Sequence, residues 1–147
     1  VIVSAGFRRS GLYPEVRQAM DQMGPAAAAG MKESPLGTLY PDVDWARLFT
    51  KLGDLLRQDY DWSKDVTAIK APTMLVFADA DIFQPAHIME FYGLLGGGRR
   101  AAELDGSGRP AGRLAVIPGA THYSILSTTM VAELVTPFLD QPPPNAR

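Results

Sequence analysis

The sequence predicts an α/β fold, in which a parallel β-sheet is flanked by helices and interrupted by a helical insertion. Two apolar segments rich in β-branched residues, 73–78 and 114–117, are typical of buried parallel strands. Each is followed by a helical pattern, and this alternation of strand and helix is typical of a parallel sheet. A third apolar segment, at the start of the chain, extends the same sheet.

The first 60 residues contain a short strand and then a segment of different character. Residues 1–6 are predicted to form a buried strand that ends in a glycine turn. Residues 7–60 contain no strand candidate and carry apolar residues at helical spacing, so we expect a small helical insertion. Its longest helix is expected to begin after a cap at either Asp42 or Asp44 and to run through Tyr60.

The remainder, residues 61–147, is expected to complete the sheet unit. In order, it should contain a connector, a strand, a helix, a polar glycine-rich loop, a second strand, a final helix and a tail. The corresponding ranges are 61–69, 73–78, 85–95, 99–112, 114–117, 129–139 and 142–147.

Composition excludes several classes of function. The net charge of −2 leaves no basic face for nucleic acid, and no apolar run approaches the length that spans a membrane. The chain has no cysteine, which excludes disulfides and thiolate metal sites and suits the cytoplasm, and we expect neither a metal nor a cofactor. It also begins inside an apolar run without Met, so we expect residues upstream to be missing.

Polar side chains follow the two clearest strands at the point where each strand ends. Asp79 and Asp81 come directly after residues 73–78, and His122 follows residues 114–117 after a Pro-Gly turn. Because ligands bind outside the carboxyl ends of parallel strands, we expect these side chains to meet at one edge of the sheet. A carboxylate that accepts from one ring nitrogen orients an imidazole base, so the set predicts an acid–base pair.

The choice between candidates rests on position. Asp81 is favoured as the acid because it lies four residues before Pro85, which opens the next helix, whereas Asp79 is better suited to bonding loop N–H groups. His122 is favoured as the base. His87, the other histidine, lies early in that helix and is expected at the surface.

Two motifs resemble those of α/β-hydrolase-fold enzymes. Residues 72–85 resemble the family's acid-bearing strand and loop, usually Pro-Thr-strand-Gly-Asp-x-Asp-x-x-x-Pro, with Ala78 in place of the usual Gly. Residues 117–122 resemble the histidine loop, usually Pro-Gly-x-x-His. The resemblance covers the whole chain and implies the C-terminal half of such an enzyme. In that half, residues 1–6 are the core strand before the cap, 7–60 the helical cap, and 61–147 the C-terminal part of the core.

The resemblance also implies what is absent. The family's nucleophile lies on a strand-turn-helix elbow, usually Gly-x-Ser-x-Gly, which precedes the acid in the chain. None of four serines fits such an elbow: Ser10, Ser63, Ser107 and Ser124. The implied enzyme is an esterase-like hydrolase with a Ser-His-Asp triad, whose nucleophile, Ser or else Asp or Cys, lies in a missing N-terminal half. The fragment alone is expected to be inactive.

The insertion predicts an apolar substrate pocket. Its residues are rich in Met and aromatic side chains, which suit an adaptable apolar site for a small ester-like substrate. The expected pocket residues are Phe7, Tyr13, Met20 and Met23, with Tyr123 at the rim beside the base.

Two further expectations concern partners. The sheet's exposed edge should bind the missing half or a second copy of the chain, because an open edge is a template for strand pairing. The alternative to an enzyme is a non-catalytic binding or interaction module with the same fold.

Overall fold

A computed structural model describes residues 1–141, so the predicted tail at 142–147 lies outside the described residues. The chain forms two compact units. The core unit consists of Val1–Tyr13 and Asp61–Arg147, and the helical unit consists of Pro14–Tyr60. The boundary of the helical unit therefore lies seven residues later than the predicted start at residue 7.

The core unit contains a parallel sheet of three strands in the order β1-β2-β3. These strands are β1 (Ile2–Val3), β2 (Met74–Ala80) and β3 (Arg113–Thr121). Ile2 pairs with Leu75, and Met74 pairs with Arg113. The two later strands run further than expected because the ladder continues past an irregularity to the pair Ala80–Thr121. The predicted parallel sheet is confirmed.

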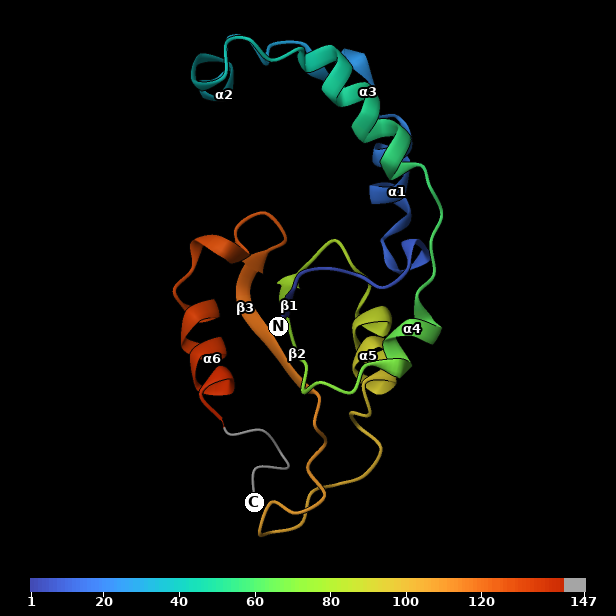
Figure 1. Cartoon of the computed structure of the whole chain (residues 1–147), viewed down its shortest axis with the longest axis vertical. Helices are drawn as coiled ribbons and strands as arrows, with labels where there is room; N and C mark the ends of the chain where they lie inside the picture. The colour runs from blue at the N-terminus through green and yellow to red at the C-terminus, as the bar shows by residue number, and fades with distance from the viewer. Residues whose placement is uncertain (142–147) are drawn as a thin grey trace. The chain divides into compact units, whose positions relative to one another are not determined.

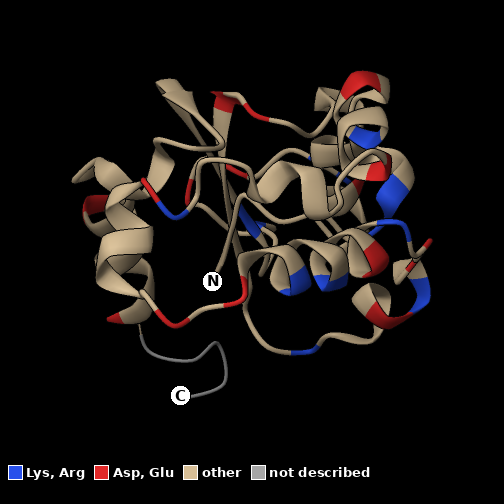
Figure 2. Ribbon diagram, turned by 90° about the horizontal axis from the view of Figure 1, so that it is seen from above, with Lys and Arg blue, Asp and Glu red and all other residues tan. Residues whose placement is uncertain are grey.

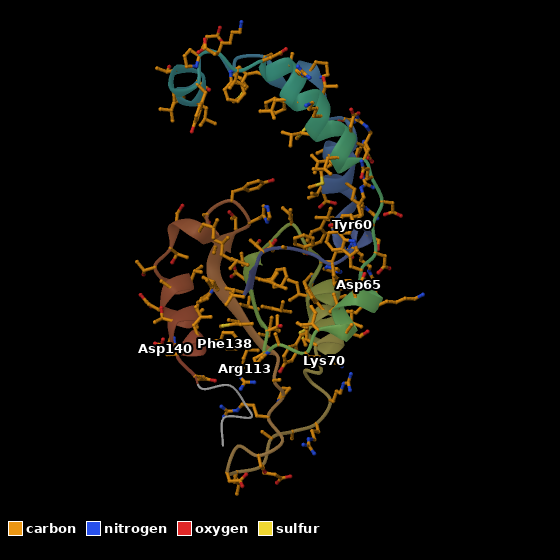
Figure 3. The ribbon with its side chains drawn as sticks, in the orientation of Figure 1. Tyr60, Asp65, Lys70, Arg113, Phe138 and Asp140 are labelled. Carbon is orange, nitrogen blue, oxygen red and sulfur yellow. The ribbon has the colours of Figure 1, made fainter. Side chains whose placement is uncertain are left out.

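Helices cover both faces of this sheet (Figure 1). On one face lies α6 (Met130–Leu139), which packs on alternate residues of β2. Its Phe138, labelled in Figure 3, contacts a cluster that includes Val76 and Ile117. On the other face lie α4 (Ser63–Ala68) and α5 (Pro85–Leu94). β2 is thus buried between layers over residues 74–78, which explains its continuous apolar run. The strands predicted to be buried at 1–6 and 114–117 are less enclosed, because β1 and β3 are edge strands: β1 is half-buried, and in β3 Ile117 is buried whereas Val116 is 49% exposed.

Aromatic rings fill the face of the sheet that α5 covers, and their packing contradicts the prediction for His87. Phe7 stacks on His87 with ring centroids 4.3 Å apart, and Phe83 stacks on the same ring at 5.5 Å. His87 is only 2% exposed, so its predicted surface position is wrong. The burial of His87 depends on a residue that lies far away in the sequence. A Cβ atom at Gly11 would come within 2.2 Å of His87 Nδ1, so the ring occupies space that only a glycine leaves.

Residues 7–13 join the core because they pair with the segment that follows the helical unit. The N–H of Trp62 donates to the carbonyl of Phe7 (2.9 Å), and Arg8 forms an antiparallel bridge with Asp61. A short 3-10 helix, η1 (Arg9–Gly11), follows. The segment expected as a connector, 61–69, contains the helix α4. The N–H of its first residue, Ser63, donates to Asp61 Oδ1 (2.9 Å).

The helical unit contains no strand, as expected. Its elements are α1 (Pro14–Asp21), η2 (Pro25–Ala28), α2 (Pro35–Leu39) and α3 (Trp45–Leu56). Asp44, and not Asp42, caps α3 by accepting from the N–H of Arg47 (3.0 Å). The helix ends four residues before Tyr60, where the apolar periodicity gives way to polar residues.

Candidate acid–base site

Asp81 occupies a buried position just beyond the end of β2. Its side chain is 1% exposed, and its carboxylate accepts hydrogen bonds from the N–H groups of Ala78 (3.2 Å) and Ile82 (2.8 Å). A buried carboxylate needs such donors to offset the loss of water. The loop after β2 therefore holds the carboxylate in a fixed orientation.

His122 follows β3 directly and meets this carboxylate. Its Nδ1 lies 3.3 Å from Asp81 Oδ1, and its side chain is 29% exposed. Two features of the fold bring them together: β2 and β3 are adjacent, and both side chains follow the carboxyl ends of their strands. The predicted proximity of Asp81 and His122 is therefore observed.

Ser4 completes the cluster, and the sequence analysis missed it. Its hydroxyl donates to Asp81 Oδ2 (2.5 Å) and lies 2.8 Å from His122 Nδ1. Ser4 directly follows β1, so all three strands deliver a polar side chain to the same edge of the sheet. A usable signal was present, because a polar residue at the end of a buried strand has the same placement as Asp81 and His122.

The other carboxylate of the acid loop has a different contact. Asp79 Oδ2 accepts from the N–H of Gly119 (2.9 Å) in the turn that precedes His122. Gly119 has a φ of +71°, a conformation that glycine adopts without strain. Asp79 thus binds backbone, as its alternative assignment predicted, and it ties the acid loop to the histidine loop.

The predicted pocket residues are placed differently from one another. Phe7 is 1% exposed and fills the core against His87. Tyr13 is held by its N–H, which donates to the carbonyl of Ile82 (3.1 Å). Tyr123 is 83% exposed, and its ring lies 5.3 Å from that of His122. Met20 lies in α1 and Met23 two residues after it, both in the helical unit.

Other kinds of site were sought in the part of the chain that the structure describes. No group of three or more His, Cys, Asp or Glu side chains is arranged to hold a metal ion in residues 1–141. None of the helices there has the length and apolar character needed to cross a membrane. Acidic and basic residues both occur along the chain (Figure 2).

Chemically, the cluster can orient a base. Asp81 and Ser4 both contact Nδ1 of His122, so neither engages Nε2. An imidazole held through Nδ1 presents Nε2 as the nitrogen that accepts a proton. Among residues 1–141, the hydroxyl that contacts this ring is that of Ser4, and it lies on the acid's side of the ring.

Comparison with known proteins gives structural neighbours only. No protein-family model and no curated protein matches the sequence. The chain resembles the solved structure of MGS-M2, an alpha/beta hydrolase enzyme from a Medee basin deep-sea metagenome library. The TM-score is 0.59 at 16% identity over 99% of this chain and 57% of that one.

A second solved structure agrees. The chain resembles E-2-(acetamidomethylene)succinate hydrolase with a TM-score of 0.50 at 14% identity, over 93% of this chain and 55% of that one. The chain thus spans a little over half the length of these neighbours. Its three-stranded parallel sheet with flanking helices therefore has the α/β-hydrolase fold.

Proposed function

We propose that this chain supplies the acid and the base of an esterase-like hydrolase, with Asp81 as the acid and His122 as the base. The observation that carries the proposal is the 3.3 Å approach of His122 Nδ1 to the buried Asp81 carboxylate at the carboxyl edge of a parallel sheet. The fold adds support, because both structural neighbours are hydrolases.

In the proposed mechanism, a nucleophile from outside the chain attacks the carbonyl carbon of an ester. His122 Nε2 takes the nucleophile's proton and then gives it to the leaving alkoxide, while the Asp81 carboxylate stabilises the imidazolium. Water then attacks the acyl-enzyme by the same route. In this mechanism Asp81 orients the base and His122 transfers the proton. The covalent bond to the substrate forms at the nucleophile, which lies outside this chain, so the chain alone should be inactive.

The proposed substrate is a small apolar ester, and the helical unit would act as its cap. Met20 and Met23, with Tyr13, would contribute adaptable apolar surface. The large exposure of the Tyr123 ring beside His122 supports a place for Tyr123 at the pocket rim. The cytoplasm stays the predicted compartment.

The first test requires the protein with its native upstream sequence. It should hydrolyse p-nitrophenyl esters, and its acyl-chain preference would define the substrate class. His122→Ala and Asp81→Asn should each lower kcat by about 10³-fold or more, as losses from a catalytic triad do. Asp105→Asn, in an exposed loop, is the matched control for the acid and should keep full activity.

Further measurements distinguish the three possible nucleophiles from one another and an enzyme from a non-catalytic module. Labelling by a fluorophosphonate would identify a serine nucleophile, and labelling by an alkylating agent a cysteine. An aspartate nucleophile would incorporate oxygen from labelled water into its carboxylate. Full activity in His122→Ala would refute the assignment of the base. Binding of esters without turnover would instead indicate a non-catalytic module.

A further inference from the structure

We infer that Ser4 is a positioning residue that fixes the tautomer of His122, an inference that rests on the proposed function only for its catalytic consequence. Ser4 contacts both members of the acid–base pair with a single atom. Its Oγ lies 2.5 Å from Asp81 Oδ2 and 2.8 Å from His122 Nδ1. Ser4 is 8% exposed, so water does not readily replace either contact.

The direction of these hydrogen bonds follows from donor counting. A carboxylate only accepts, so the single hydrogen of the Ser4 hydroxyl is committed to Asp81. The oxygen then has only lone pairs left for His122. Nδ1 must therefore carry a hydrogen and donate it, which leaves Nε2 of the neutral ring as an acceptor. This is the tautomer that a general base requires.

Ser4 does more here than the acid alone does. The distance from Nδ1 to Ser4 Oγ (2.8 Å) is that of a good hydrogen bond, whereas Nδ1 lies 3.3 Å from Asp81 Oδ1. The hydroxyl therefore links the carboxylate to the ring, and Asp81 acts on His122 partly through Ser4. No proton passes through Ser4 in this role. The Nδ1 hydrogen stays in place while Nε2 takes and returns the nucleophile's proton.

The backbone conformation of Ser4 is one that surrounding contacts must hold in place. Its φ is +49°, and it is the only non-glycine residue with positive φ in the part of the chain that the structure describes. Such conformations are costly for residues other than glycine and persist where surrounding contacts hold them. Here the N–H of Ser4 donates to the carbonyl of Val76 (2.8 Å), which anchors the residue to β2 beside its two side-chain contacts.

The same geometry argues against Ser4 as the nucleophile. In a triad, the nucleophile's hydroxyl bonds to the ring nitrogen opposite the one that faces the acid. Ser4 and Asp81 instead share Nδ1. The family's elbow requires a helix that begins directly after the nucleophile, and no helix begins directly after Ser4. The next element is the three-residue η1.

The test is the tautomer of His122, read from the ¹⁵N shifts of its ring nitrogens at about pH 9, where imidazoles are neutral. The wild-type chain should show the hydrogen on Nδ1. Ser4→Ala and Ser4→Gly should shift the population toward hydrogen on Nε2. The two variants differ in strain, because glycine tolerates the positive φ, so a shared shift is due to the lost hydroxyl. Ser63→Ala, whose hydroxyl bonds to the exposed Asp61, is the matched control.

This readout needs neither nucleophile nor substrate, so it separates the inference from the proposed function. An unchanged tautomer in both Ser4 variants would overturn the positioning role even if His122 proves essential for turnover. In the protein with its upstream sequence, Ser4→Ala should lower kcat by about ten- to a hundredfold with KM unchanged, the size of one charge-assisted hydrogen bond. A fluorophosphonate adduct on Ser4 would overturn the inference by making it the nucleophile.

Discussion

The two histidines of the chain lie in opposite environments. His122 is partly exposed beside a carboxylate, whereas His87 is stacked between Phe7 and Phe83. Neither ring nitrogen of His87 has a hydrogen-bond partner within residues 1–141. Burial lowers the pKa of His87, because a charged ring loses its hydration there. Among the charged groups that face it, Arg8 lowers the pKa further, while Glu90 and Asp61 oppose that shift.

A pH dependence of stability follows from the lowered pKa of His87. Below about pH 6.5 the unfolded chain binds a proton at this histidine that the folded chain resists. The free energy of unfolding is therefore fully maintained above that pH and falls as the pH drops below it. His87→Phe should remove this part of the dependence. Urea denaturation of both proteins at pH 7.5 and 5.5 measures the difference, and parallel losses in the two proteins would contradict the prediction.

Glycines at two positions should respond oppositely to the same substitution. Gly119→Ala places a side chain at a φ of +71° and should lower the free energy of unfolding by about 1–2 kcal/mol. Gly93→Ala lies inside α5, where an added Cβ meets no atom within 4 Å. It should raise the free energy of unfolding by up to about 1 kcal/mol. Urea denaturation measures both, and changes of the same sign would contradict the assigned backbone conformations.

Sequence predicted Asp81 and His122, whose placement depends on local order along the chain, and it missed Ser4, which follows β1 in the same way. Asp81 and His122 each follow a recognisable strand, so adjacency of the strands was enough to bring them together. The environment of His87 was not predictable in this way. It depends on Gly11 and Phe7, which lie more than 70 positions away in the chain and approach only in the folded core.

At the scale of secondary-structure elements, contacts at the two ends of α3 explain why its start was predicted and its end was not. Asp44 caps α3 because its side chain reaches the N–H of Arg47, a contact that the sequence left open between two candidates. Beyond the C-terminus of α3, the guanidinium of Arg57 donates to the carbonyl of Met23 (2.9 Å). The end of α3 is thus fixed partly by a segment more than 30 residues earlier, which periodicity alone does not reveal.

The cap of α3 gives a prediction for the helical unit. Asp44→Ala should lower the stability of this unit by about 1 kcal/mol, because the first turn of the helix loses an acceptor. Asp42→Ala removes a carboxylate two residues earlier and is the matched control. Hydrogen exchange of the α3 amides measures the effect. Equal exchange rates in the two variants would show that the Asp44 cap contributes nothing.

For the whole molecule, the three-stranded sheet of residues 1–141 has an unpaired edge on β1 and another on β3, and the edge of β1 lies at the start of the chain. Within residues 1–141, β1 pairs with β2 on one side only, and Val1 beside it is 48% exposed. Unpaired strand edges bind further strands. We propose that this edge binds an N-terminal half of the protein, or a second copy of the chain when that half is absent.

This proposal predicts association of the isolated chain that depends on concentration. Light scattering coupled to gel filtration should detect it, and Val1→Lys should weaken it, because a charge at an edge strand disfavours pairing. Leu104→Lys introduces the same charge in an exposed loop outside the sheet and is the control. A monodisperse monomer with a cooperative melt at all concentrations would refute the proposal.

The helical unit leaves and rejoins the core at a paired point of the backbone. The bridge between Arg8 and Asp61 and the bond from Trp62 to Phe7 hold the two flanking segments together independently of what lies between them. Residues 14–60 therefore form a compact unit whose two flanking segments are joined within the core unit. Replacement of residues 14–60 by another insertion should therefore leave intact the strands that precede Asp81 and His122.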